Sequence, residues 1–163
     1  MIKIKNWEMD VPKYIDDVFC LDNFSAFSVV IDGVEYKTTE HAFQALKFIE
    51  TDKVVYEMVK NSQSPYDARE LAHKNKPKRD PDWSDKKYKI MEFVLTEKVL
   101  QNNYVKERLL ATNDAEIIED CGADDDKDWG CGIDGTGQNN LGKIWMKIRE
   151  KIKQSEHCKE KKG

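Results

Sequence analysis

The chain has 163 residues, which is enough for one domain with a substantial hydrophobic core. Charged residues make up 36% of the sequence and aromatic residues 10%, and that share of aromatics excludes a disordered protein. The formal net charge of −4 argues against a protein that follows long duplex nucleic acid, and no apolar run is long enough to cross a membrane.

The cysteines and histidines do not have the spacing of metal ligands. The cysteines form no C-x-x-C pair and no signal peptide is recognisable, so we expect reduced thiols in a cytoplasmic protein. An acidic run lacks the pattern of a calcium-binding loop. We predict no metal and no cofactor from this set of residues: Cys20, Cys121, Cys131, Cys158, His41, His73, His157, Asp124, Asp125, Asp126 and Asp128.

The first predicted elements are two short strands and a helix. A strand around residues 27–31 runs into the turn Asp32-Gly33, which is typical of a β-hairpin, and a second strand follows at residues 34–36. Thr38 or Thr39 then caps a helix whose amphipathic pattern extends through residue 48.

The next predicted helix begins at Ser64, followed by Pro65 and by Asp67 three residues after the cap. A Pro- and charge-rich loop, residues 74–83, ends at Trp83. The longest helix is predicted to open at Ser84 and Asp85.

Four further elements are predicted for the rest of the chain. A short helix over residues 104–112 precedes a strand at 115–120 and an irregular, glycine-rich segment at 121–140. A last helix runs from about Asn140 through "LGKIWMKIREKIKQ", and the Lys-rich tail, residues 153–163, is expected to fray.

One stripe of the first predicted helix carries an acid, an amide and an amine. Glu40, Gln44 and Lys47 fall at i, i+4 and i+7. Charged helix faces are usually solvated, so one interpretation is a wet surface. The other is a site in which the acid and the amine act together on a ligand.

Two other features have both a structural and a functional interpretation. Glycines before Asn139 and Asn140 expose backbone N–H groups where a helix begins, which suits a phosphate, although the segment is otherwise simply an acidic loop. Trp83 and Trp129 lie in predicted irregular segments, where each either stacks on a flat base or fastens a loop to the core.

Six fragments, taken in order, resemble one family: "LDNFSAFSVVIDGVEYKTTEHAFQALKF", "SPYDARELA", "DW", "LLATNDAEIIE", "WGCG" and "GQNNLGKIWMKIRE". They are similar to the NADAR (NAD- and ADP-ribose-associated) family, also called YbiA-like, over residues 18–152. The resemblance implies an α+β, mostly helical fold, with a small β-sheet or hairpin, in a single compact domain spanning residues 1–163.

Members of this family are linked to cleavage of unusual N-glycosidic bonds. Two substrate classes are associated with it: ADP-ribose attached to guanine, and ribosylamino-pyrimidine phosphate intermediates of riboflavin synthesis. The resemblance therefore implies a small-molecule nucleotide substrate, with ADP-ribosylated DNA or RNA as a wider context, and no membrane or metal.

Carried over position by position, the resemblance implies three catalytic residues. Glu40 matches the acid of the family's "EH" motif, Lys47 its lysine, and Asp126 the Asp ahead of the glycine loop. The substrate-binding residues implied are Asn23, Phe24, His41, Gln44, Arg79, Trp83, Trp129, Gly130, Gly137, Asn139, Leu141 and Gly142.

The chain departs from the family at three positions, which affects substrate details more than the reaction type. Asp128 replaces an aromatic before the second tryptophan, and Asp22 replaces a small Ser before Asn23. Arg79 lies one residue further from Trp83 than expected.

Both substrate classes place ribosyl C1 on an exocyclic amine, whose lone pair can open the sugar ring to an imine. A neutral Lys47 can add at C1 and displace the base, with Glu40 moving protons and Gln44 orienting. The alternative is direct hydrolysis, with Glu40 or Asp126 activating water and Lys47 holding phosphate or ring hydroxyls.

Removal of ADP-ribose from guanine is the first functional hypothesis, with Arg79 or Lys143 adding charge at the phosphates. The second is cleavage of the riboflavin-pathway intermediates. The third is a module that binds ADP-ribose or NAD without turnover, which the presence of both Glu40 and Lys47 disfavours.

Overall fold

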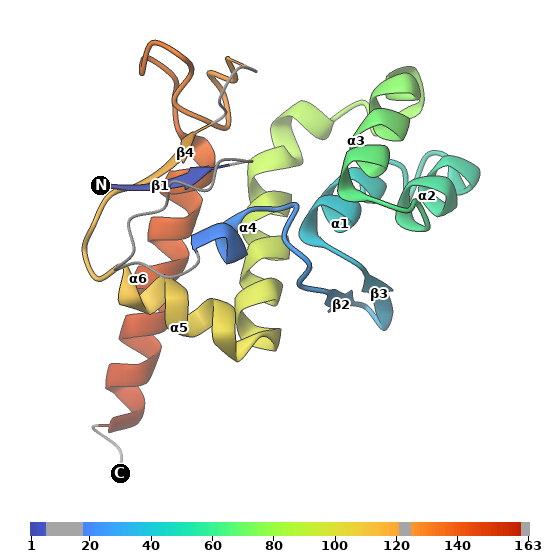
Figure 1. Cartoon of the computed structure of the whole chain (residues 1–163). Helices are drawn as coiled ribbons and strands as arrows, with labels where there is room; N and C mark the ends of the chain where they lie inside the picture. The colour runs from blue at the N-terminus through green and yellow to red at the C-terminus, as the bar shows by residue number, and fades with distance from the viewer. Residues whose placement is uncertain (6–17, 121–124, 161–163) are drawn as a thin grey trace. The chain divides into compact units, whose positions relative to one another are not determined.

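The computed structural model describes residues 1–5, 18–120 and 125–160, and they form two compact units (Figure 1). The first unit combines Met1–Asp22 with Asn103–Gly163, and the second is Asn23–Asn102. Helices dominate and the strands form two small sheets, so the predicted α+β, mostly helical fold is confirmed. None of the helices in the described residues is both long and apolar enough to cross a membrane.

The second unit opens with the predicted hairpin. Strands β2 (Val29–Ile31) and β3 (Val34–Tyr36) pair antiparallel. The connecting residues Asp32 and Gly33 have φ values of 50° and 78°, which is the left-handed geometry that a two-residue hairpin turn requires. The Asp-Gly pair therefore predicts this turn correctly.

Helix α1 is surrounded by the other elements of the second unit. It contacts α2, α3, α4 and β3, and the shared core is apolar. Sequence reasoning named no helix in the region of α2. The helical segments of this unit are α1 (Thr39–Ala45), α2 (Lys53–Lys60), α3 (Pro65–Lys74), the 3₁₀ turn η2 (Lys76–Lys78) and α4 (Trp83–Gln101).

The predicted starts of α1 and α3 are confirmed. The Thr38 hydroxyl accepts a hydrogen bond from the backbone N–H of His41, so Thr38 is the N-cap of α1. Ser64 and Asp67 form a capping box at the start of α3, with Pro65 at the first helical position.

Two boundaries differ from the prediction. Helix α1 ends at Ala45 and does not extend through Phe48, because the Phe48 N–H bonds to the Ala45 carbonyl and tightens the last turn. The carbonyl of Lys47 then accepts a hydrogen bond from the Asp80 N–H at 2.8 Å. Helix α4 begins one residue early, at Trp83, which is a buried helical residue and not a loop residue.

The first unit contains a parallel strand pair packed on a long helix. Strands β1 (Ile2–Lys5) and β4 (Ile117–Asp120) pair with Ile2 opposite Ile117, and β4 packs on α6 (Figure 1). β1 was not predicted. The other segments are η1 (Val18–Leu21), α5 (Asn103–Ala111) and α6 (Asn140–Glu160).

Two residues at the start of α6 join this helix to β4. The side-chain amide of Asn139 accepts a hydrogen bond from the Glu119 N–H and donates one to the Ile117 carbonyl, both at 2.9 Å. A Cβ added at Gly142 would lie 2.1 Å from the Ile117 carbonyl oxygen. Gly142 therefore allows the helix to approach the strand closely.

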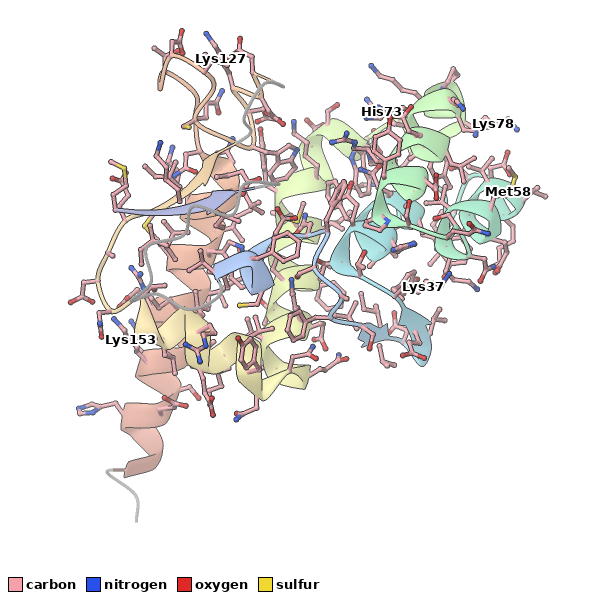
Figure 2. All side chains as sticks on the ribbon, in the orientation of Figure 1. Lys37, Met58, His73, Lys78, Lys127 and Lys153 are labelled. Carbon is pink, nitrogen blue, oxygen red and sulfur yellow. The ribbon has the colours of Figure 1, made fainter. Side chains whose placement is uncertain are left out.

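Helix α6 continues further than predicted, because its last turns are tied to neighbouring segments. The side chain of Lys153, which is labelled in Figure 2, forms an ion pair with Asp114 at 2.7 Å. Glu156 pairs with Lys106 on α5. The tail expected to fray is therefore helical as far as Glu160.

Replacing Gly142 by Ala tests this close approach. Alanine normally stabilises a helix, but here the added methyl group must displace backbone, and we expect a loss of about 1–3 kcal/mol in the free energy of unfolding. Urea denaturation measures it. Lys143→Ala, an exposed neighbour, is the control and should change the free energy by less than about 0.5 kcal/mol. A stabilised Gly142→Ala variant would contradict the packing.

Candidate active site

Glu40 is a buried carboxylate in the first turn of α1. Only 5% of the residue is exposed, and its oxygen Oε1 accepts a hydrogen bond of 2.8 Å from the Gln44 side-chain amide. The backbone N–H of Glu40 bonds to the Asn23 carbonyl at 3.1 Å, which fixes where the helix begins. The i, i+4 pair predicted from sequence therefore forms, and it is buried and not solvated.

Lys47 is buried beside two aromatic rings. It lies just after α1 and is 8% exposed. Its Nζ is 5.3 Å from the centre of the Phe43 ring and 5.6 Å from that of Trp83, and the two ring centres are 5.2 Å apart. An apolar wall therefore surrounds the amine in place of water.

The surroundings favour the neutral form of Lys47. Burial is the largest cause and lowers the pKa of Lys47 from its ordinary 10.5 to about 8, against the opposing effect of the Glu40 carboxylate. Arg79, Lys87 and Lys76 lower the pKa further through like-charge repulsion. A larger share of neutral amine is thus present near neutral pH than in an exposed lysine, which is what a lysine nucleophile needs.

Two other predicted residues of the second unit support α1 from its N-terminal side. The Asn23 side chain accepts a hydrogen bond from Thr39 and donates one to the Met91 sulfur. His41 bonds to Thr38 through Nδ1 and to the Ser62 carbonyl through Nε2, so its ring atoms serve the fold. Burial lowers the pKa of His41, in keeping with a neutral ring.

The remaining predicted residues of this unit have different surroundings. The Trp83 ring is 2% exposed and packs against Phe43, so it is a wall beside Lys47 and not an open stacking surface. Phe24 lies against the guanidinium of Arg69, at 5.4 Å. Arg79 is half-buried and acts electrostatically on Lys47.

The other predicted residues belong to the first unit. The Asp126 carboxylate accepts hydrogen bonds from the N–H groups of Asp128 and Trp129, both at 2.8 Å, and so shapes the turn before the glycine loop. Trp129 is half-buried and Gly130 is buried.

The expected route to phosphate binding at the start of α6 is not open in this structure. The backbone N–H groups of Gly137, Asn139 and Leu141 already donate to the carbonyls of residues 131, 130 and 129, respectively. A Cβ at Gly137 would lie 2.3 Å from the Gly130 carbonyl oxygen. Gly137 therefore allows two parts of the loop to pack closely, and phosphate binding by these N–H groups stays a prediction that their present hydrogen bonds do not support.

Several residues near Lys47 were missed by sequence reasoning. No functional role was predicted for Phe43, Lys76 or Lys87. Lys87 lies four residues after Trp83, so a helix beginning at Trp83 would have placed both on one face. Among the described residues, no three His, Cys, Asp or Glu side chains are grouped as a metal site.

Comparison with known proteins now identifies the family. The model of the NADAR domain matches residues 12–153. The chain belongs to the NADAR family.

Among curated NADAR relatives, the N-glycosidase YbiA of Escherichia coli is 34% identical over 138 residues, which cover 84% of this chain and 83% of that protein. A riboflavin biosynthesis protein of Vibrio vulnificus is 35% identical over 134 residues, and the chain spans 35% of its length. The NMR structure of E. coli YbiA matches with a TM-score of 0.78 and 28% identity, covering 95% of this chain and 87% of that one.

Burial of Lys47 predicts a cost in stability. Because the folded state lowers its pKa from 10.5 to about 8, Lys47→Met should raise the free energy of unfolding at pH 7 by up to about 3 kcal/mol. Between pH 8 and 10.5 the unfolded chain binds the extra proton, so wild type gains stability as the pH rises and the gap to Lys47→Met closes. Urea denaturation at several pH values measures this.

The matched control is Lys89→Met on α4, where the lysine is exposed. It should change stability little and keep the pH dependence of wild type. A Lys47→Met variant that is no more stable than wild type at pH 7 would show that the ammonium is better solvated than its burial implies.

Proposed function

We propose that the protein is an N-glycosidase that cleaves the bond between a ribosyl C1 and an exocyclic amine, with Lys47 as nucleophile and Glu40 as acid and base. The buried Lys47, with its pKa lowered to about 8 beside Glu40, carries this proposal. The YbiA relatives are named as N-glycosidases, which supports the reaction class.

In the proposed reaction, the nitrogen lone pair of the leaving amine forms a C1=N bond as the bond from C1 to the ring oxygen breaks. The Glu40 carboxylate relays a proton from solvent to that oxygen. The neutral Nζ of Lys47 then adds to C1. A proton moves from Nζ to the leaving nitrogen, the bond from C1 to that nitrogen breaks, and a C1=Nζ Schiff base remains.

Water resolves the Schiff base in the second half of the reaction. It adds to C1 and gives one proton back to Glu40, and the resulting carbinolamine collapses to the sugar aldehyde and free Lys47. One water is consumed for each bond cleaved. Gln44 serves as a positioning residue, because its amide holds one oxygen of Glu40.

ADP-ribosylated guanine, as base, nucleotide or nucleic acid, is the first candidate substrate. The second is a ribosylamino-pyrimidine phosphate intermediate of riboflavin synthesis. The Vibrio vulnificus relative is named as a riboflavin biosynthesis protein, which favours the second substrate. Both candidates have the linkage that a lysine nucleophile requires, and both carry phosphate.

Lys47→Arg distinguishes a nucleophile from a charge holder. Arginine keeps the positive charge but cannot become neutral, so we expect kcat to fall by at least about a thousandfold if Lys47 forms the Schiff base. Borohydride added during turnover should trap the sugar on the peptide that contains Lys47, which mass spectrometry detects. Wild-type kcat/KM should rise with pH and level off above about pH 8.

Lys89→Arg, on the exposed face of α4, is the control and should keep the wild-type rate. Activity of Lys47→Arg within about tenfold of wild type, without trapped sugar, would instead support direct hydrolysis with Lys47 holding an anion.

The two substrates are separated by offering each to wild-type protein at equal concentration without added divalent ion. For the first candidate we expect release of ADP-ribose from ADP-ribosylated guanosine, with inhibition by ADP-ribose stronger than by ribose 5-phosphate. Chromatography with mass detection measures both products. A kcat/KM more than about tenfold higher for the ribosylamino-pyrimidine phosphate would decide for the second.

A further inference from the structure

Several cations surround the buried amine of Lys47. One carboxylate, Glu40, opposes three cations, Arg79, Lys87 and Lys76, at this position. Burial alone already lowers the pKa of the amine, so the cations add repulsion to a site that is unfavourable for charge. The like-charge repulsion among these groups is reduced when an anion binds.

Two of these cations, Lys76 and Arg79, lie at the start of the turn η2 and directly after its end. The hydrogen bond from the Arg79 N–H to the Lys76 carbonyl closes a 3₁₀ turn, in which side chains at i and i+3 project in the same direction. The bond from the Asp80 N–H to the Lys47 carbonyl fixes this turn against the segment that carries the amine. These two backbone hydrogen bonds therefore hold Lys76 and Arg79 near Lys47.

Acids close to this turn are already engaged by other lysines. Asp52 pairs with Lys78 at 3.1 Å, and Asp80 pairs with Lys86 at 2.7 Å. Within the described part of the chain, Lys76 and Arg79 form no ion pair with an acidic side chain. Two neighbouring cations thus remain with donors available for a ligand.

We propose that Lys76, on the turn η2, and Arg79, the residue directly after it, bind a phosphoryl group of the ligand whose ribosyl C1 reaches Lys47. Arg79 supplies a planar pair of donors and Lys76 a point charge, a combination that suits phosphate oxygens. The phosphoryl group is either the monoester of a ribose 5-phosphate or the diphosphate of ADP-ribose. The identity of this ligand rests on the proposed function.

This assignment moves the phosphate away from the start of α6. The N–H groups expected to hold it there donate to loop carbonyls, whereas Lys76 and Arg79 lie in the same unit as Glu40 and Lys47. Lys87, one turn along α4 from Trp83, adds a third positive charge to the same surroundings.

Calorimetric titration with ribose 5-phosphate, and separately with ADP-ribose, tests the site. Lys76→Gln/Arg79→Gln should weaken binding of the phosphorylated ligand at least about tenfold, and affinity for ribose itself should not change. The ligand that loses more affinity shows whether a monoester or a diphosphate occupies the site. Lys78→Gln, in the same turn but paired with Asp52, is the matched control and should bind within about twofold of wild type.

In turnover, the double variant should raise KM at least about tenfold, because the contacts to the phosphoryl group are lost. Thermal melting checks that all variants fold, and the single variant Lys76→Gln, at an exposed side chain, gives a smaller loss of affinity if the double variant is unstable.

The outcomes separate this inference from the proposed function. Equal affinity of the double variant and wild type, or no phosphate-dependent binding by wild type, overturns the site whether or not the protein cleaves N-glycosides. Loss of phosphate binding in the double variant, in a protein that cleaves neither substrate, upholds the site and overturns the proposed reaction.

Discussion

The candidate site of the second unit depends on the burial of Lys47. An ammonium group withdrawn from water is unfavourable unless it is paired or gives up its proton, and Lys47 lies between these two outcomes. Phe43 and Trp83 exclude water from it, while the Glu40 carboxylate partly compensates its charge. The resulting pKa of about 8 is a compromise between apolar packing and one nearby acid.

This compromise requires that Glu40 and Lys47 keep their places, and the surrounding hydrogen bonds serve that end. The Asn23 carbonyl and the Thr38 hydroxyl hold the first turn of α1, and a neutral His41 connects Thr38 to the Ser62 carbonyl. At the other end, the Asp80 N–H holds the Lys47 carbonyl. The acid is positioned from the start of the helix and the amine from just beyond its end.

Local features of this arrangement could be predicted from sequence, because they depend on residues close in the chain. The Asp32-Gly33 turn, the Ser64 capping box and the Glu40–Gln44 spacing all belong to this kind. The end of α1 could not, since it depends on a tight turn and on contact with residue 80. The β1–β4 pair could not either, because its parallel partners are more than 100 residues apart in the chain.

The N–H groups at the start of α6 show the same dependence on long-range packing. Glycines before a helix predict exposed N–H groups, but whether these are open depends on where the preceding loop passes. Here the carbonyls of Asp128, Trp129 and Gly130 cap the start of α6. Sequence shows where donors occur, whereas long-range packing decides whether they are already used.

Charge and burial therefore have separable roles around Lys47. Burial, the largest cause of the lowered pKa, acts on the amine whether or not a ligand is present. The repulsion from Arg79 and Lys76 would weaken if an anion bound to them. A phosphorylated ligand would therefore reverse only the smaller part of the pKa shift of Lys47. A lysine whose neutrality came mainly from neighbouring cations would regain its proton when the substrate bound. Because burial is the largest cause here, the pKa of Lys47 would stay lowered even with an anion on the proposed phosphoryl site.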